Sequence, residues 1–158
     1  MGLGKTLQSI TLLYTCLTQG VDGKPLAKRA LVVCPTSLVS NWEKEITKWV
    51  PNRLKVLALA ETTREKATMD INTFITTREY SVLIISYETF RIHCDKFHAR
   101  AESCDLLICD EAHRLKNDRT LTTQSLAGLA CRRRVILTGT SPSTTLARAG
   151  SLRGRASC

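Results

Sequence analysis

The chain has 158 residues, of which 43% are hydrophobic and 23% are charged. This balance is typical of a globular domain rather than a disordered chain, and no apolar run approaches the roughly 20 residues of a membrane-spanning helix. The formal net charge of +9 suits an anionic partner such as nucleic acid or a nucleotide. The solubility of an ordinary domain explains that charge equally well, and we expect no membrane partner.

The chain begins with a short glycine-rich motif, Gly2-Leu3-Gly4-Lys5-Thr6. It matches the second half of the phosphate-binding pattern G-x-x-x-x-G-K-[ST], whose first position would lie two residues before Met1. Glycines let the backbone approach phosphate oxygens, and a helix starting near Lys5 would direct its free N–H groups to the same place. Lys5 would reach the β- and γ-phosphates, and the Thr6 hydroxyl would ligate Mg²⁺. From this motif alone, a glycine-rich turn that only begins a helix remains an equal alternative.

Short apolar segments then alternate with segments of helical period. We expect a helix from Lys5 onward, a second over residues 38–49 with a capping box at Ser40 and Glu43, a third running from a cap at Thr62 to Ile75, and a fourth over residues 88–97. Strands are expected at residues 30–34, 54–59, 81–86, 105–109 and 134–140. Continuous apolar strands separated by helices predict an α/β domain, in which a parallel sheet is covered on both faces.

Several other residue types receive ordinary structural interpretations. We interpret the seven scattered cysteines, which form no C-x-x-C pair, as reduced intracellular thiols rather than as a zinc site or a disulfide framework. Trp42 and Trp49 would pack on the apolar face of their helix, and His93 and His98 have no partner motif. Arginines 132–134 would form a solvated turn before the last strand.

A second motif, Asp110-Glu111-Ala112-His113, follows the apolar strand at 105–109. The carboxyl end of a buried parallel strand is where α/β folds bind ligands. Asp110 would hold Mg²⁺ through water, and Glu111 would orient and deprotonate an attacking water molecule. A lone Asp-Glu pair is usually a solvated turn. Together with the lysine of the first motif, however, this pair predicts a nucleoside triphosphatase.

At this point the sequence resembles a family, the superfamily-two helicase-like ATPases, in which residues 110–113 would be the DEAH box. Four segments resemble the Swi/Snf type: LVVCPTSLVSNWEKEITKW, IISYETFR, DEAHRLKN with its R-x-K-N extension, and LTGT. The set is most similar to the Rad-fifty-four-like double-stranded DNA translocases and covers residues 1–140. Two alternatives remain: a chromatin remodeller of another Swi/Snf branch, and a non-catalytic nucleotide- or DNA-binding module.

The resemblance implies a RecA-like first helicase lobe, with residues 1–140 as a partial ATP-binding domain. It implies ATP and Mg²⁺ binding at Gly2, Leu3, Gly4, Lys5 and Thr6, with Asp110 and Glu111 at the metal and the attacking water. It implies DNA contacts at Pro35, Thr36, Ser37, Ser86 and Tyr87. It also implies coupling of the nucleotide site to DNA movement through His113, Thr138, Gly139 and Thr140. The implied setting is homologous recombination in the nucleus, with double-stranded DNA and a recombinase filament as partners.

The chain departs from the family pattern at both ends, where we expect truncation. The family's glycine-rich loop follows a central strand, and we expect the loss of that strand to leave two neighbouring strands unpaired. After Thr140, residues 141–158 contain three arginines and no acidic residue, and we interpret them as a disordered, aberrant tail. The family's second lobe, which supplies arginine fingers, is also missing. The isolated chain is therefore expected to hydrolyse ATP scarcely at all.

Overall fold

The computed structural model describes residues 3–112 and 119–137. Within these ranges, five strands form one sheet in the order β2-β3-β1-β4-β5, and every pairing is parallel. The strands are β1 (Ala30–Cys34), β2 (Val56–Ala58), β3 (Val82–Ser86), β4 (Leu106–Asp110) and β5 (Arg133–Leu137). The predicted Gly2, His113, Thr138, Gly139 and Thr140, and the tail 141–158, lie outside the described residues.

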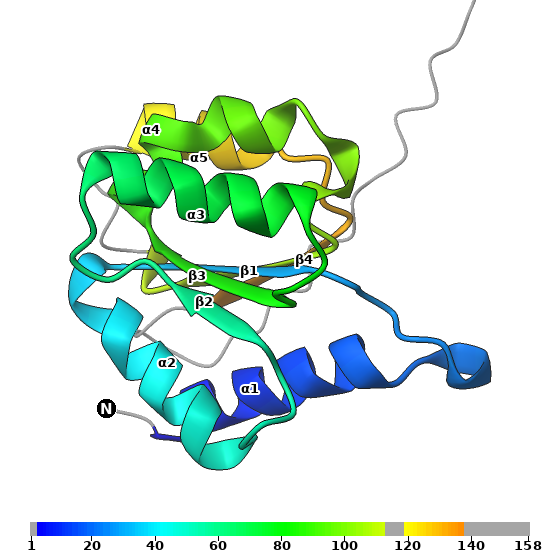
Figure 1. Cartoon of the computed structure of the whole chain (residues 1–158). Coiled ribbons are helices and arrows are strands. Elements are labelled where there is room, and N and C mark those ends of the chain that lie inside the picture. The colour runs from blue at the N-terminus through cyan, green and yellow to red at the C-terminus, as the bar shows by residue number, and fades with distance from the viewer. Residues whose placement is uncertain (1–2, 113–118, 138–158) are drawn as a thin grey trace, which may run out of the picture.

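Five α-helices cover the two faces of the sheet. They are α1 (Leu3–Thr18), α2 (Thr36–Trp49), α3 (Arg64–Thr76), α4 (Tyr87–His98) and α5 (Arg119–Ala127), with short 3-10 helices η1 (Val21–Gly23) and η2 (Ala101–Ser103). Helices α1 and α2 lie on one face, and α3, α4 and α5 lie on the other (Figure 1). The predicted α/β fold, a parallel sheet with helices on both faces, is confirmed. None of the helices in the described part of the chain has the length and apolar character needed to cross a membrane.

The central strands contribute side chains to two hydrophobic cores, one on each face of the sheet. Successive side chains of a strand point to opposite faces, so a continuous apolar strand supplies both. In β1, Leu31 and Val33 pack under α3 and α4, whereas Ala30 and Val32 pack against α1 and α2. All five residues of β1 and of β3 are buried. The sheet is therefore a rigid platform for the residues at its edges.

The strand ladder corrects one expectation. We expected two neighbouring strands to be left unpaired, but the described strands pair without interruption from β2 to β5. β5 has a single neighbour among them, and Ile136 on it is 50% exposed. The expected gap between two strands is therefore absent from the described sheet, in which β2 and β5 are the edge strands.

Element boundaries differ from the predicted ones where local chemistry intervenes. Helix α2 begins at Thr36, and its N-cap is Pro35, which makes no side-chain cap bond. The capping box predicted at Ser40 and Glu43 is therefore wrong, because both residues lie inside the helix. The N-cap of α3 is Thr63, one residue after the predicted cap; its hydroxyl oxygen accepts a bond from the N–H of Lys66.

Candidate functional site

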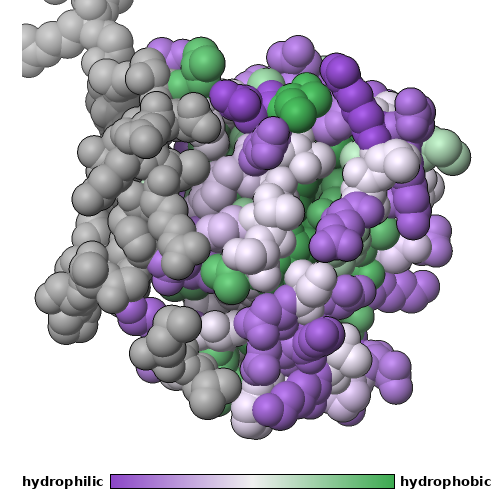
Figure 2. Space-filling model, turned by 90° about the vertical axis from the view of Figure 1, so that its left-hand side faces the viewer, coloured by the Kyte–Doolittle hydropathy of each residue, from purple (hydrophilic) through white to green (hydrophobic). Residues whose placement is uncertain are grey.

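One predicted motif ends a strand at one edge of the sheet, and the described residues of the other lie on a helix that begins beneath that edge (Figure 1). Because all five strands are parallel, their carboxyl ends share that edge, and α2 and α4 start there, directly after β1 and β3. Helix α1 also begins beneath it, on the left of Figure 1. The described surface on this side is mainly hydrophilic, with only small apolar spots (Figure 2).

Asp110 is the last residue of β4 and lies at this edge, on the strand next to the middle strand β1. Its carboxylate Oδ2 accepts a 2.9 Å hydrogen bond from the indole N–H of Trp42 on α2. Its backbone oxygen accepts a 2.8 Å bond from the hydroxyl of Tyr87, the first residue of α4. Helices from both faces of the sheet therefore hold the end of β4 in place.

The electrostatics of Asp110 connect it with the first motif. Burial raises the pKa of its carboxyl above the ordinary value, and the Trp42 hydrogen bond lowers it. The negative charge of Glu111 raises that pKa, whereas the backbone N–H of Glu111 and the Lys5 ammonium charge lower it; the net result is a raised pKa. Lys5 and Asp110 are far apart in sequence, yet the folded chain brings their charges within range of each other. This is the arrangement on which a joint nucleotide site depends.

Glu111 turns the chain sharply away from the sheet. Its φ of 53° lies in the left-handed region, which costs a residue other than glycine about 1–2 kcal/mol. Such strain is often found at functional sites, where the surrounding structure fixes it. Asp110 therefore has the extended backbone of β4, whereas the next residue, Glu111, has a left-handed backbone.

The first turn of α1 carries Gly4, Lys5 and Thr6. Lys5 is exposed and Thr6 is half-buried. A Cβ built on Gly4 would meet no atom within 4 Å, so the described protein leaves open space beside this helix start. A helix N-terminus next to open space is suited to an anion.

The residues expected at DNA fall into two groups. Pro35, Thr36 and Ser37 lie at the uncapped start of α2, and Thr36 and Ser37 are exposed. Ser86 and Tyr87 are buried: the Ser86 hydroxyl caps α4 by accepting from the Thr89 N–H, and Tyr87 bonds the Asp110 carbonyl. The two buried side chains face protein groups, and their contact with DNA stays a prediction.

The thiols near the site carry no charge. Burial raises the pKa of Cys34 and of Cys109 to about 12, so both stay protonated at neutral pH. Burial likewise raises the pKa of Tyr87, which keeps its hydroxyl a donor. Every cysteine in the described part of the chain is a free thiol. Neither these thiols nor the Tyr87 hydroxyl therefore adds a negative charge to that of Asp110 and Glu111 at neutral pH.

Sequence reasoning missed the role of Trp42. Trp42 is buried, as expected for packing, but its indole N–H also binds the Asp110 carboxylate. Helical periodicity reports which face a residue occupies and says nothing about a partner on another element. Trp49 differs from its prediction, since it is 45% exposed and its indole N–H donates to Glu45.

A large cavity lies away from this edge. It has a volume of about 570 Å³ and lies where β1, β3 and β4 begin, with Ala27, Arg29, Ser81 and Asp105 in its lining. It contains none of the predicted site residues. Ligands in parallel α/β sheets bind at the carboxyl ends of the strands. We therefore place the candidate site at Asp110 and not in this cavity.

Comparison with known proteins agrees with the predicted family. The sequence profile of the SNF2-related domain matches residues 1–147. The chain is 64% identical over 141 residues to Protein CHROMATIN REMODELING 25 of Arabidopsis thaliana, covering 89% of this chain and 15% of that protein. It is 63% identical over 141 residues to DNA repair and recombination protein RAD54 of rice, covering 89% of this chain and 14% of that protein. The chain thus spans about one-seventh of the length of these relatives.

A solved structure agrees with the fold. The chain superimposes on the Sulfolobus solfataricus SWI2/SNF2 ATPase core in complex with double-stranded DNA with a TM-score of 0.67, at 28% identity. The match covers 89% of this chain and 26% of that one. The expected RecA-like lobe is confirmed, and the chain belongs to the SNF2-related domain family.

Proposed function

We propose that this chain is the ATP-binding part of a DNA-dependent SNF2-type ATPase that translocates on double-stranded DNA during homologous recombination and double-strand-break repair. The observation that carries the ATP site is that α1, with Lys5 in its first turn, begins beneath the edge at which Asp110 ends β4 (Figure 1). The recombination role rests on relatives named RAD54 in rice and RAD54-like in Drosophila ananassae, the latter 49% identical over 146 residues.

The described residues fit Mg²⁺ and a triphosphate. The Lys5 ammonium group, the Thr6 hydroxyl and the helix N-terminus at the start of α1 are groups of the kinds that bind phosphates and a metal. In this proposal Gly2, Leu3, Gly4 and Lys5 bind the phosphates, while Thr6 and Asp110 hold Mg²⁺. The bound metal would neutralise charge on the phosphate oxygens.

The two carboxylates have separate roles. Asp110 is fixed by the Trp42 indole and by its place at the end of β4, which suits a group that must hold a metal in one position. Glu111, on its left-handed backbone, would orient the attacking water and accept its proton. Lys5 would offset the negative charge gathered at this edge.

DNA would bind at the same edge through its phosphates. The exposed, uncapped start of α2 at Pro35, Thr36 and Ser37 offers backbone N–H groups and hydroxyls, which suit phosphate contacts. Ser86 and Tyr87 would then support the DNA-binding edge indirectly: Ser86 caps α4, and Tyr87 holds the Asp110 carbonyl. His113, Thr138, Gly139 and Thr140 would couple the nucleotide site to DNA movement. A nuclear location and a recombinase filament as partner belong to the same proposal.

A second candidate is a chromatin-remodelling ATPase of another Swi/Snf branch. It is favoured by the printed name of the Arabidopsis relative, to which this chain is 64% identical. The two candidates share the ATP site and differ in the substrate on which the motor acts. Binding to nucleosomes in preference to naked duplex would favour the second.

Duplex DNA binding by the 158-residue chain tests the proposal. We expect binding that weakens steeply with salt, by about 0.9 log unit of affinity per log unit of salt for each phosphate contacted, and that is similar for two unrelated sequences. Salt-insensitive, sequence-specific binding would contradict a translocase.

ATP turnover of the same chain tests the expected need for a second lobe. We expect scarcely any turnover, with or without duplex DNA, because an arginine finger contributes about 10³–10⁵ in rate in other phosphoryl-transfer systems. DNA-stimulated turnover that disappears in Glu111→Gln would show that this chain is an active ATPase by itself.

A further inference from the structure

A cluster of metal-ligand side chains lies on α4, on the opposite face of the sheet from α1. Cys94, Asp95 and His98 each offer one ligand atom, and these atoms lie within 4.8 Å of one another. Asp95 and His98 are exposed, and Cys94 is half-buried. The SNF2-type function described above does not use any of them.

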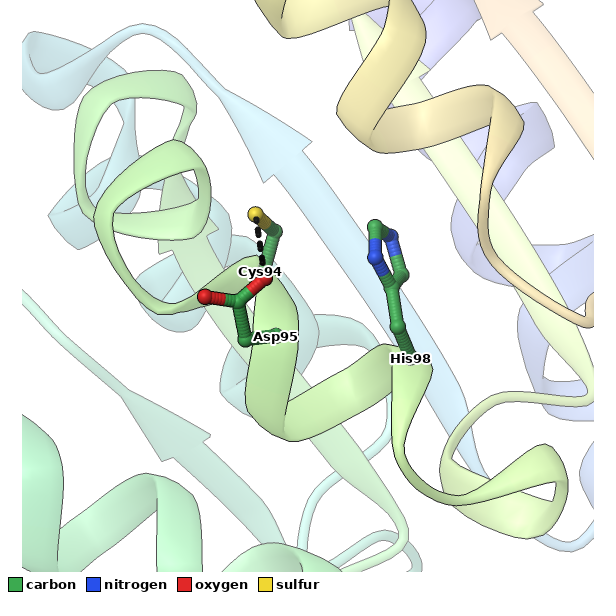
Figure 3. Close-up of side chains that lie close together, drawn as sticks. All are labelled: Cys94, Asp95 and His98. Atoms are coloured by element: carbon green, nitrogen blue, oxygen red, sulfur yellow. Dashed lines mark hydrogen bonds between the residues drawn. The ribbon is translucent and has the colours of Figure 1, made fainter.

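Helical geometry brings the three side chains together. His98 follows Cys94 by four residues and Asp95 by three, and both spacings place side chains on neighbouring positions of a helix surface. The thiol of Cys94 is 3.9 Å from Oδ1 of Asp95. Figure 3 shows these two groups and a nitrogen of the His98 ring facing one another.

The His98 ring is held in place by α5. Its Nε2 lies 2.7 Å from the backbone oxygen of Ser125. A carbonyl oxygen can only accept, so we assign the proton of the neutral ring to Nε2, which leaves the lone pair on Nδ1. Histidines that bind metals usually donate their other N–H to a carbonyl or carboxylate in this way.

Gly128, just after α5, makes room for the ring. A Cβ on Gly128 would approach Cε1 of His98 to 2.8 Å and Nε2 to 3.0 Å. The adjoining face of α4 is anchored in the core by Phe90, His93 and Phe97, and Cys94 packs against the same core. The imidazole thus stands on a fixed helix before any ligand arrives, which lowers the entropic cost of binding.

We propose that Cys94, Asp95 and His98 form a binding site for a divalent transition-metal ion, for which Zn²⁺ is the best match. Thiolate, imidazole and carboxylate form a Zn²⁺ donor set, whereas Mg²⁺ and Ca²⁺ require oxygen ligands. A tetrahedral Zn²⁺ ion with bonds of about 2.0–2.3 Å keeps its ligand atoms roughly 3.3–3.7 Å apart. The observed cluster therefore needs to contract by about 1 Å, and water would complete the coordination.

Charge is balanced in this site. On binding, the Cys94 thiol loses its proton to solvent, so one thiolate and one carboxylate neutralise the two charges of the ion. The ligands lie in the last two turns of α4, where the helix dipole favours a cation. The bond of His98 to the Ser125 carbonyl already joins α4 to α5, and an ion bound at Nδ1 would leave it in place.

Titration of the reduced 158-residue chain with Co²⁺ alone tests the proposal, since a bound thiolate produces a charge-transfer band in the near ultraviolet. We expect the wild-type chain to bind one equivalent that Cys94→Ala loses completely. Affinity should fall at least tenfold in Asp95→Asn and in His98→Gln. Glu88→Gln, which removes another exposed carboxylate of α4, is the matched control and should bind as the wild type does.

Alkylation of the wild-type chain gives a second readout, which does not depend on the fold of a variant; Asp95→Asn serves only as a comparison. Zn²⁺ should protect Cys94 of the wild-type chain from iodoacetamide, as followed by peptide mass spectrometry, and should not protect it in Asp95→Asn. An unchanged band in Cys94→Ala, or alkylation of wild-type Cys94 that is indifferent to Zn²⁺, would overturn the proposal. His98 would then serve only as a cap for the last turn of α5.

Discussion

Asp110 is stabilised as an anion at a position where burial disfavours the charge. The Trp42 indole and the Lys5 ammonium group both lower its pKa, against burial and the neighbouring Glu111, which raise it. The raised pKa that results is a cost to stability at neutral pH. Such a cost is what we expect if Asp110 holds a metal ion, as proposed.

Removal of the Trp42 indole donor should lower the stability of the folded chain. In Trp42→Phe, the Asp110 carboxylate loses a 2.9 Å hydrogen bond while most of the packing is kept. We expect the free energy of unfolding at pH 7 to fall by about 1 kcal/mol, because the carboxylate keeps some access to water. Urea denaturation measures it. Trp49→Phe, which alters an exposed indole bonded to Glu45, is the matched control, and an equal loss in both variants would refute a specific role for Trp42.

Replacement of Asp110 should stabilise the chain. Because its pKa is raised in the folded state, the folded chain binds the Asp110 proton more tightly than the unfolded chain. The unfolding free energy of the wild type is therefore reduced as pH rises from the ordinary carboxyl pKa through the raised value. Asp110→Asn keeps an acceptor for Trp42 and avoids that loss.

We thus expect Asp110→Asn to be more stable than the wild type at pH 7 and equally stable at pH 3. Urea denaturation of both chains across this pH range measures the difference. A destabilisation by Asn that is the same at every pH would contradict the raised pKa.

At the scale of elements, Arg134 on β5 holds the end of α5. Its Nη atoms donate to the carbonyl oxygens of Leu126, Ala127 and Leu129, and its Nε donates to that of Cys131. The last carbonyl groups of a helix lack partners within the helix, and a basic side chain can satisfy them. Arginines 132–134 were expected to form a solvated turn, so the interpretation of Arg134 is wrong.

Loss of this guanidinium should loosen α5. We expect Arg134→Met to lower the free energy of unfolding by about 2 kcal/mol, because several half-buried carbonyl groups lose their donor together. Arg132→Met, on the exposed neighbour, is expected to change it by less than about 0.5 kcal/mol. Hydrogen exchange of the α5 amides should increase in the first variant only. Unchanged hydrogen exchange of the α5 amides in Arg134→Met would contradict the role of Arg134 in holding the end of α5.

The sequence predicted the elements whose structure follows from the pattern of their own residues, and missed one that depends on contacts with other elements. The central strands are continuous apolar runs that become buried on both faces, so β1, β3 and β4 match their predictions to within one residue. Helix α5, with the sequence RTLTTQSLA, has few apolar residues and was not predicted. Its partners lie on other elements, Arg134 on β5 and His98 on α4, and a local pattern cannot reveal them.

At the scale of the whole molecule, topology explains what the sequence could predict of the site. Parallel strands bring their carboxyl ends to one edge, so the end of an apolar strand was enough to place Asp110 there. The charge of Lys5 acts at that edge because α1 begins beneath it. The Trp42 bond and the left-handed Glu111 depend on how α2 and β4 pack. The spacing of residues in the sequence predicts neither the Trp42–Asp110 hydrogen bond nor the left-handed backbone of Glu111.

Under the proposed function, the start of α1 and the end of β4 form one binding surface for Mg²⁺ and a triphosphate. Calorimetric titration of the 158-residue chain with a non-hydrolysable ATP analogue and Mg²⁺ measures this joint binding. We expect Mg²⁺-dependent binding that weakens at least tenfold, or about 1.4 kcal/mol, in Lys5→Ala and in Asp110→Asn. Lys44→Ala, at an exposed position on α2, should bind as the wild type does. Wild-type affinity in both site variants would contradict the assignment of this edge as the nucleotide site.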